Sequence, residues 1–497
     1  MSLLNLLILL PLAAALAIFA GAPARRTALG ATATALLVAL AALVGYDRTA
    51  GGFQFAFRAD ILPDWGLAYA VGADGFSLLM LGLTTVVALC AIAVAPANIG
   101  NEKAYFASLL FIAAGATGAF ASTDLFFFYL FHELALIPTF LLIGIWGTGD
   151  RRQAAWKITI YLAAGSFVLL IGLLALYFAL PAGVRTFDMV RLPEILGATP
   201  LGAGPQKWIA LLLLTGFGVL ISLFPFHTWA PDAYASAPVP AAMLHAGVLK
   251  KFGLYGLIRV AVPLVPEGMR HWADLLLLLL LGNILVVGLI TLAQKQLDRM
   301  LGCSSVMHMG YAFLGIASLN QTGLGGAALL LVAHGLSIAL LFALAGEIRQ
   351  RTGSLDFKDL GGLLTCAPFL GLMFGLAAFA SIGLPGFANF AAELLIFFGA
   401  FGNGLPFAGF DSYQFATTLA LWGVVISAVY MLRAYRAVFM GGTSGRCKGI
   451  TDLPAGARWP LVLLVALLLL AGCWPQLLLD FIQPTLSGAP GMVANVR

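Results

Sequence analysis

The chain has 497 residues, of which 61% are hydrophobic and only 9% are charged, with a mean hydropathy of +1.00. A soluble domain carries roughly 25% charged residues, so this composition excludes a soluble globular protein and indicates a chain that crosses a membrane many times. The net charge of +5 fits basic cytoplasmic loops and gives no reason to expect nucleic-acid binding. The five cysteines form no CxxC pair, so neither a disulfide framework nor a zinc site or iron–sulfur cluster is supported.

Apolar runs long enough to span a bilayer recur along the whole chain. We predict an all-α polytopic protein that forms a single membrane domain over residues 1–497, with its longest loops near 46–71, 181–206 and 441–458. We expect 14 transmembrane helices, at about 3–20, 27–45, 72–95, 104–120, 122–147, 153–180, 207–229, 237–263, 272–293, 301–318, 323–349, 366–401 (broken), 412–440 and 459–481.

The first apolar run is expected to be retained as a helix. No basic residue precedes it, and Arg25 and Arg26 follow it, which is the reverse of a signal peptide. With both termini outside, the cytoplasmic loops hold roughly twice as many Lys and Arg as the outer loops. We therefore expect a multi-pass protein of a bacterial inner (cell) membrane with both termini on the periplasmic side.

Ionisable side chains lie inside several predicted helices, where an unpaired charge is expensive and usually functional. Histidine, lysine and glutamate all exchange protons, and no His or carboxylate pair has metal-ligand spacing. We therefore interpret these residues as a proton relay and expect no metal. The candidates are Glu133, Lys157, Lys250, Lys251, His308, His334 and Glu393.

Two basic residues, the relay candidate Lys157 and Arg259, lie near the ends of predicted helices. Lys157 is expected either to reach the cytoplasmic interface or to pair with Glu133. Arg259 is expected to extend its charge to the interface beside its own helix end.

Two predicted helices contain breaks. Pro225 interrupts the seventh, with His227 just after it, and Pro385 and Gly386 interrupt the twelfth. Broken helices are tolerated inside a membrane where they line a polar cavity, and matched breaks indicate internal repeats. The breaks lie five helices apart, so helices 4–8 (residues 104–263) and 9–13 (residues 272–440) are predicted to be two repeats. Because five is odd, the repeats must be inverted.

Several segments resemble the antiporter-like subunits of NADH:quinone oxidoreductase, respiratory complex I. In chain order they are "FHELALIPTFLLIGIWG", "FPFHTWAPDA", "HAGVLKKFGLYGLIR", "GCSSVMHMGYAFLGIASLN" and "SIGLPGFANFAAELLI". Within that family the chain is most similar to the subunit M (chain 4) group. Glu393 stands where related subunits tend to have Lys, and the chain ends soon after helix 14 without the long lateral helix of subunit L.

The resemblance implies a membrane-arm subunit that moves protons while redox chemistry happens elsewhere in the complex. It implies a non-catalytic subunit of the enzyme, with no cofactor in this chain. NAD, FMN, iron–sulfur clusters and quinone would belong to partner subunits, and L-type and N-type antiporter-like subunits would be its neighbours.

The resemblance also implies roles for single residues. Glu133 would be the helix-5 glutamate that tunes a nearby lysine, and Lys251 the helix-8 lysine at the centre of the relay. His308 and His334 would be relay histidines, with Glu393 as the exit-side acid. Lys157 matches a common basic position on helix 6, and Pro225 and Pro385 match the helix breaks.

One position departs from the family pattern. Leu220 stands where relatives carry a lysine on helix 7, and Lys250 stands where they usually have an apolar residue. Our hypothesis is that Lys250 replaces the missing cation next to Glu133 or at the helix-7 cavity. The alternative is a copy that pumps poorly, or one that belongs to a variant complex with a second pumping subunit.

Three other functions stay open from the sequence. One is the D-type subunit of a multisubunit Na⁺/H⁺ antiporter, which shares the fold. Another is the equivalent subunit of a membrane-bound hydrogenase or formate hydrogenlyase. The third is a purely structural scaffold, for which Glu133→Gln and Glu393→Gln would leave pumping intact.

Overall fold

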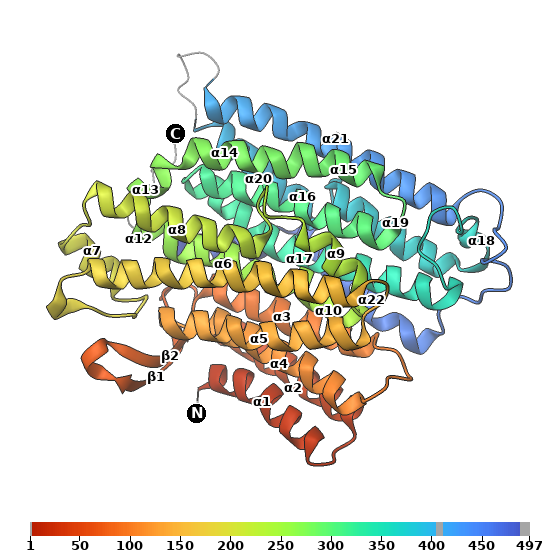
Figure 1. Ribbon diagram of the computed structural model, residues 1–497, viewed down its shortest axis with the longest axis horizontal. Helices are drawn as coiled ribbons and strands as arrows, with labels where there is room; N and C mark the ends of the chain where they lie inside the picture. The colour runs from red at the N-terminus through yellow and green to blue at the C-terminus, as the bar shows by residue number, and fades with distance from the viewer. Residues whose placement is uncertain (1, 404–410, 488–497) are drawn as a thin grey trace.

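The computed structural model describes residues 2–403 and 411–487 as a bundle of long helices that run roughly alongside one another (Figure 1). The first part comprises α1 (Leu3–Phe19), α2 (Ala24–Gly45), α3 (Gly75–Ala93), α4 (Glu102–Ala121), α5 (Leu125–Trp146) and α6 (Arg151–Ala179). The middle part comprises α7 (Leu192–Ala198), α8 (Ala203–Ile221), α9 (Trp229–Ser236), α10 (Val239–Leu244), α11 (Lys251–Gly256), α12 (Val262–Leu264) and α13 (Pro266–His271).

The remaining helices complete the bundle. They are α14 (Ala273–Leu281), α15 (Gly288–Ala293), α16 (Leu297–Ala317), α17 (Gln321–Thr352), α18 (Leu363–Cys366), α19 (Pro368–Ile382), α20 (Ala388–Phe401), α21 (Ser412–Phe439), α22 (Ala455–Cys473) and α23 (Gln476–Ser487). Among the described residues, 11 helices are long and apolar enough to cross a membrane, and α1, α19 and α20 are shorter apolar helices. The prediction of a mainly helical, multi-pass membrane protein is confirmed.

A β-hairpin corrects the expectation of an all-α chain. Strands β1 (Gln54–Leu62) and β2 (Leu67–Ala73) pair antiparallel, and Gly66 takes the left-handed conformation (φ 62°) in the turn between them. Hydropathy predicts a loop near 46–71, because it does not detect the pairing between two short strands. The hairpin lies at one end of the bundle (Figure 1), where β1 is largely exposed and most of β2 is buried.

Three π-helical turns interrupt the middle helices. His245–Leu249 and Leu257–Ala261 lie between α10, α11 and α12, and Gly282–Val287 joins α14 to α15. A π turn inserts an extra residue, and such turns are frequent at functional sites. Each turn therefore changes which side chains share a face, a change that a simple helical repeat does not predict.

Arg259 does not stay unpaired, and its extension to the membrane interface stays a prediction. Its guanidinium, on a side chain that is 11% exposed, makes an ion pair with Asp74, the N-cap of α3, and donates to Tyr255 Oη at 3.2 Å. Thr485 Oγ1 of α23 donates to the other carboxylate oxygen of Asp74 at 2.8 Å. The pair thus joins α3, the segmented helix of residues 239–264 and α23.

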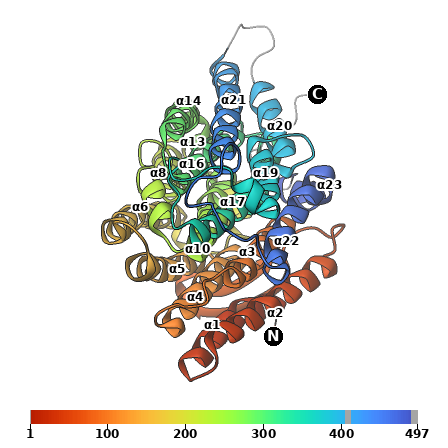
Figure 2. The ribbon, with the colours of Figure 1, turned by 90° about the vertical axis from the view of Figure 1, so that its right-hand side faces the viewer.

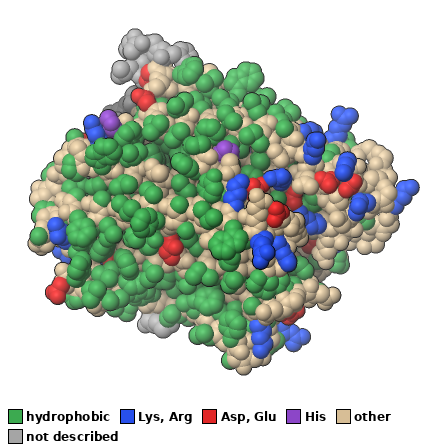
Figure 3. Space-filling model, in the orientation of Figure 1, with side chains coloured by type: hydrophobic (Ala, Val, Ile, Leu, Met, Phe, Trp, Pro, Cys, Tyr) green, Lys and Arg blue, Asp and Glu red, His purple; other side chains and the backbone are tan. Residues whose placement is uncertain are grey.

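The centre of the bundle is formed by α16 and α17, whose most apolar 18-residue stretches are entirely buried. Figure 2 shows α17 surrounded by the other helices. The face in Figure 3 is mostly apolar, and Lys, Arg, Asp and Glu gather towards one end of the molecule. This distribution fits a protein whose sides face lipid and whose ends face water.

Candidate functional site

The first helix break separates α8 from α9. Helix α8 ends at Ser222, which has a left-handed backbone (φ 70°), and α9 begins only at Trp229. Pro225 and His227 lie in the interval, and the ring of His227 stacks on Phe224 with centroids 5.4 Å apart. Leu220 is buried in the last turn of α8, within the hydrophobic core.

The second break separates α19 from α20. Gly383 (φ 81°) ends α19, and Gly386 (φ 96°) follows two residues before α20 begins. Pro385 has no N–H to offer the carbonyl of Ser381 four residues earlier, so that carbonyl is free for another donor. Nε2 of His308 lies 2.8 Å from it. The break therefore supplies a backbone acceptor to a buried histidine.

Lys251 and His334 form the centre of the site. Both side chains are buried, and Lys251 Nζ lies 2.8 Å from Nδ1 of His334 and donates to the carbonyl of Ala246 at 2.7 Å. Glycines allow this contact, because a Cβ on Gly335 would lie 2.7 Å from the carbonyl oxygen of Gly247. The close approach of α17 to the π turn before Lys251 brings the lysine and the histidine together.

His308 extends the site towards the second break. Its ring centroid is 5.6 Å from that of His334, and its Nδ1 lies 2.8 Å from the carbonyl of Ser304. A carbonyl oxygen only accepts hydrogen bonds. Since Nε2 also faces a carbonyl, on Ser381, only a ring that carries both protons donates in both contacts.

Glu393 lies beyond the second break. It is buried on α20, and its Oε1 has no hydrogen-bond partner among the described residues. Its Oε2 would lie 2.5 Å from a Cβ placed on Gly383, so a larger residue at the end of α19 would displace this carboxylate.

Glu133 is placed apart from the lysines. Its side chain is 31% exposed, accepts a hydrogen bond from Ser166 Oγ and lies 3.6 Å from Nδ1 of His132. It lines a small cavity of about 220 Å³ between α5 and α6. The ring of His132 stacks on Phe252, the neighbour of Lys251, with centroids 4.1 Å apart. His132 thus lies between Glu133 and the helix that carries Lys251.

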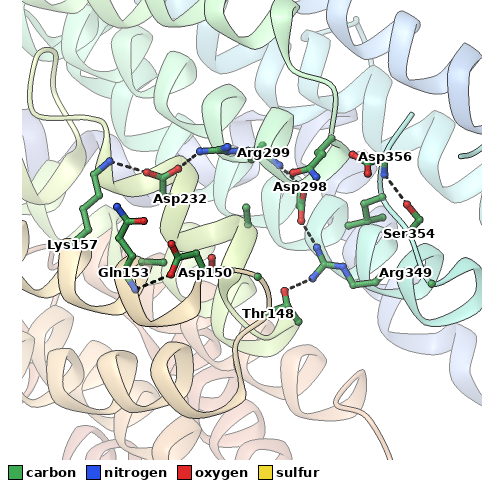
Figure 4. Close-up of a pocket in the computed structure, with 17 residues that line it drawn as sticks. Thr148, Asp150, Gln153, Lys157, Asp232, Asp298, Arg299, Arg349, Ser354 and Asp356 are labelled. Carbon is green, nitrogen blue, oxygen red and sulfur yellow. Dashed lines mark hydrogen bonds and ion pairs between the residues drawn. The ribbon is translucent and has the colours of Figure 1, made fainter. Parts of the chain in front are cut away.

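Lys157 points into a larger polar cavity of about 760 Å³, shown in Figure 4. It donates to Asp232 at 2.7 Å and does not pair with Glu133. Asp232 also pairs with Arg299. Burial by itself raises the pKa of Asp232, but the ion pairs with Lys157 and Arg299 outweigh it and hold that pKa below its ordinary value. Asp232 therefore stays ionised beside its two cations near neutral pH.

Further acidic and basic side chains alternate along the same cavity. The backbone N–H of Arg299 donates to Asp298 at 2.8 Å, Asp298 pairs with Arg349, and Arg349 donates to Thr148 Oγ1 at 3.1 Å. Figure 4 shows these residues in a row across the cavity. The row joins α6, α9, α16 and α17, and the last two of these helices also carry the buried histidines His308 and His334.

Lys250 is buried and does not face the lipid. Its Nζ has no hydrogen-bond partner among the described residues and lies 5.7 Å from the centre of the Tyr234 ring on α9. It makes no ion pair with Glu133 in the described part of the chain.

Three polar residues in this region are not among the relay candidates that the sequence predicts. They are His132, His245, which lies 3.3 Å from Tyr234 Oη, and Asp232. The sequence signal that could have identified them is a histidine or an acid within or beside an apolar segment. Among residues 2–403 and 411–487, no group of three or more His, Cys, Asp or Glu side chains has the arrangement of a metal site.

Comparisons with known proteins give a consistent answer. Residues 122–419 match the family model described as "NADH:quinone oxidoreductase/Mrp antiporter, TM". The chain is 36% identical to NAD(P)H-quinone oxidoreductase chain 4 of Gloeobacter violaceus, over 97% of this chain and 91% of the relative. It is 35% identical to NADH-quinone oxidoreductase subunit M of Rhodobacter capsulatus, over 98% of this chain and 96% of the relative.

A solved structure agrees with these relatives. One chain of respiratory complex I from Thermus thermophilus with bound NADH superposes with a TM-score of 0.87 and 30% identity. The match covers 98% of this chain and all of that one. The arrangement of helices described above is therefore that of a membrane subunit in that complex.

Proposed function

This chain belongs to the subunit M (chain 4) family of NADH:quinone oxidoreductase, and from that premise we propose that it is a proton-translocating membrane subunit of such a complex. It carries no redox site of its own. NAD, FMN, iron–sulfur clusters and quinone belong to partner subunits, and L-type and N-type antiporter-like subunits flank it in the membrane arm. The membrane is the inner (cell) membrane of a bacterium.

The proposed topology has 14 transmembrane spans in two inverted repeats, residues 104–263 and 272–440. The 11 long apolar helices support it once α1, the segmented helix of residues 239–264 and the pair α19–α20 are counted as one span each. The two breaks support the repeat, since each follows a residue with positive φ, Ser222 or Gly383, and contains a proline. Both termini lie on the periplasmic side.

The observation that carries the proposed function is the contact of Lys251 with His334 beside His308. A lysine 2.8 Å from a histidine nitrogen, with a second imidazole 5.6 Å further on, is a set of proton donors and acceptors within short steps. Glu393, on the far side of the second break, receives the proton and passes it to the periplasmic side.

The proposed inlet is the charged cavity of Figure 4. Lys157 and Asp232 lie in it, and the Nζ of Lys250 lies 5.7 Å from the ring of Tyr234 on α9, the helix that carries Asp232. The position of Lys250 against α9, the second half of the broken helix, supports its substitution for the lysine that Leu220 lacks. In this proposal Lys250 acts at the helix-7 cavity and not as a direct ion-pair partner of Glu133.

The proposed driving force is electrostatic. A carboxylate near a lysine favours the protonated ammonium, and withdrawal of that negative charge makes the ammonium a better proton donor. Glu133 reaches the lysine helix through His132 and Phe252, so a change at Glu133 alters the field at Lys251 without a direct contact. Redox chemistry in partner subunits supplies the energy for this change.

The test uses the whole complex reconstituted in vesicles. We expect Glu393→Gln and Glu133→Gln to remove most proton translocation per electron, because glutamine cannot exchange a proton at neutral pH. Quinone reduction by uncoupled vesicles should remain. Proton translocation is measured with a pH-sensitive dye, and Glu194→Gln on the exposed surface of α7 is the matched control. Normal pumping in both Glu133→Gln and Glu393→Gln would leave a structural scaffold as the correct function.

A further inference from the structure

We propose that Asn283 is a positioning residue that holds the first helix break in shape and ties it to the helix that carries His308. The proposal rests on the proposed proton-translocating function and adds a residue that lies outside the relay itself. Asn283 lies in the π-helical turn Gly282–Val287 between α14 and α15, and its side chain is fully buried. Figure 1 shows these helices running beside α16.

The side chain of Asn283 makes two hydrogen bonds to the backbone of the first break. Its Oδ1 accepts a hydrogen bond from the backbone N–H of Phe224 at 2.7 Å, and its Nδ2 donates to the carbonyl of Ser222 at 3.0 Å. These two backbone groups flank the place where α8 ends. A buried backbone group without a partner is strongly unfavourable in a membrane, so the carboxamide supplies hydrogen bonds that the broken helix does not provide.

The conformation at Ser222 explains why the break needs supporting hydrogen bonds. Ser222 has φ 70°, a left-handed conformation that non-glycine residues rarely adopt and that persists when surrounding contacts hold it. A carboxamide is a compact side chain that carries an acceptor and two donors. It therefore matches the exposed N–H and carbonyl on either side of the break.

The second donor of Asn283 reaches a different helix. Nδ2 also donates to the carbonyl of Val306 at 3.0 Å, and Val306 precedes His308 by two residues on α16. His308 in turn contacts the Ser381 carbonyl in the second break. A continuous set of hydrogen bonds and one helix thus connects the two breaks, and a displacement of the first is transmitted to the imidazole at the second.

Glycines on both sides make this arrangement possible. A Cβ on Gly282 would lie 2.6 Å from the ring of Phe224, and a Cβ on Gly310 of α16 would lie 3.2 Å from Cβ of Asn283. The π-helical turn therefore lies between the break and α16 at a distance that larger residues would not allow. Asn283 bridges the break and α16 at this close approach.

Hydrogen exchange of the assembled complex tests directly whether the hydrogen bonds of Asn283 hold the break. We expect Asn283→Leu, which keeps the size of the side chain but removes its three hydrogen bonds, to speed exchange of the Phe224 amide about tenfold. Thr291→Val on α15 is the matched control, because Thr291 is equally buried but bonds only to the carbonyl of Val287 in its own helical segment. Exchange at Phe224 should not change in that control. Unchanged exchange in Asn283→Leu would overturn the proposal.

Proton translocation per electron tests the functional part. Asn283→Leu should lose most of it while quinone reduction in uncoupled vesicles remains. Asn283→Asp keeps the acceptor for Phe224 and, when protonated, one donor, so it should retain the slow exchange and about half of the translocation. Should the leucine variant fail to assemble, Asn283→Ala leaves room for water, and the same faster exchange is expected.

The outcomes separate this proposal from the proposed function. Faster exchange at Phe224 with normal translocation would show a local structural role and refute the positioning role. If Glu133→Gln and Glu393→Gln pump normally, the proposed function fails, whereas the exchange experiment still decides whether Asn283 holds the break.

Discussion

At the scale of single residues, Asp124 combines a helix cap with a charge that is expensive to bury. It precedes α5, and its Oδ1 accepts hydrogen bonds from the N–H groups of Phe126 and Phe127. Burial raises the pKa of Asp124 to about 6, against the opposing effect of these N–H groups and of Ala68. An acid whose pKa is raised by folding stabilises the fold fully only below its unfolded pKa, and this contribution is lost as the pH rises through about 6.

Asp124→Asn should therefore raise the melting temperature of the purified complex more at about pH 8 than at about pH 5. Asparagine caps helices as well as aspartate does, so the hydrogen bonds to α5 remain. Asp124→Ala loses the cap, which costs about 1 kcal/mol, but it also removes the buried carboxyl and should therefore be less destabilising at about pH 8 than at about pH 5. Thermal unfolding at the two pH values is the measurement, with Asp150→Asn at the exposed N-cap of α6 as the control. An equal effect at both pH values would contradict the expectation.

At the scale of an element, the end of α19 depends on a glycine for two separate reasons. Gly383 has φ 81°, and a Cβ there would collide with the carboxylate of Glu393. Gly386 has φ 96° but open space where its Cβ would be. Gly383→Ala should therefore impair proton translocation by displacing Glu393.

Gly386→Ala provides the control, because it introduces only the backbone strain of roughly 1–2 kcal/mol. Both variants should lower thermal stability, Gly383→Ala at least as much as Gly386→Ala, but only Gly383→Ala should lower the number of protons moved per electron. Proton-to-electron ratios in vesicles and thermal unfolding of the same preparations separate the two effects. A matching loss of translocation in Gly386→Ala would attribute the effect to strain and not to Glu393.

At the scale of the whole molecule, the mostly apolar face of the bundle is suited to lipid and to neighbouring subunits. Partner identity separates the proposed complex from the two alternatives with the same fold. Purification through a tag on this chain should recover flavin- and iron–sulfur-containing subunits, which catalyse NADH-dependent quinone reduction. Mass spectrometry and absorption spectra are the measurements. Recovery of antiporter subunits without cofactors, or of a nickel-containing partner, would contradict the assignment and favour one of the alternatives.

Much of the fold follows from local chemistry, and the expected multi-pass architecture is confirmed. The hairpin at residues 54–73 was assigned to a loop, because pairing of β1 with β2 depends on contacts between strands and not on hydropathy. Asn283 was not singled out either, although a lone asparagine after Gly282 in the run "LLLLLLLGNILVVGLI" was a visible signal. Its meaning needs the break at Ser222, which lies 61 residues away in the chain.

The amino-acid sequence alone indicates the membrane class, the positions of the two breaks and five of the buried ionisable residues, Lys250, Lys251, His308, His334 and Glu393. These properties are local, because hydropathy, a proline without an N–H group and a charge within an apolar run can each be recognised from a short segment of sequence. Only the tertiary structure decided which residues meet. Lys157 pairs with Asp232 and not with Glu133, and Lys251 meets His334 through the glycine contact of α17. The pairing of side chains depends on how each helix is rotated and on how closely neighbouring helices approach. Both are determined by the π turns and by the packing of segments that are distant in the sequence.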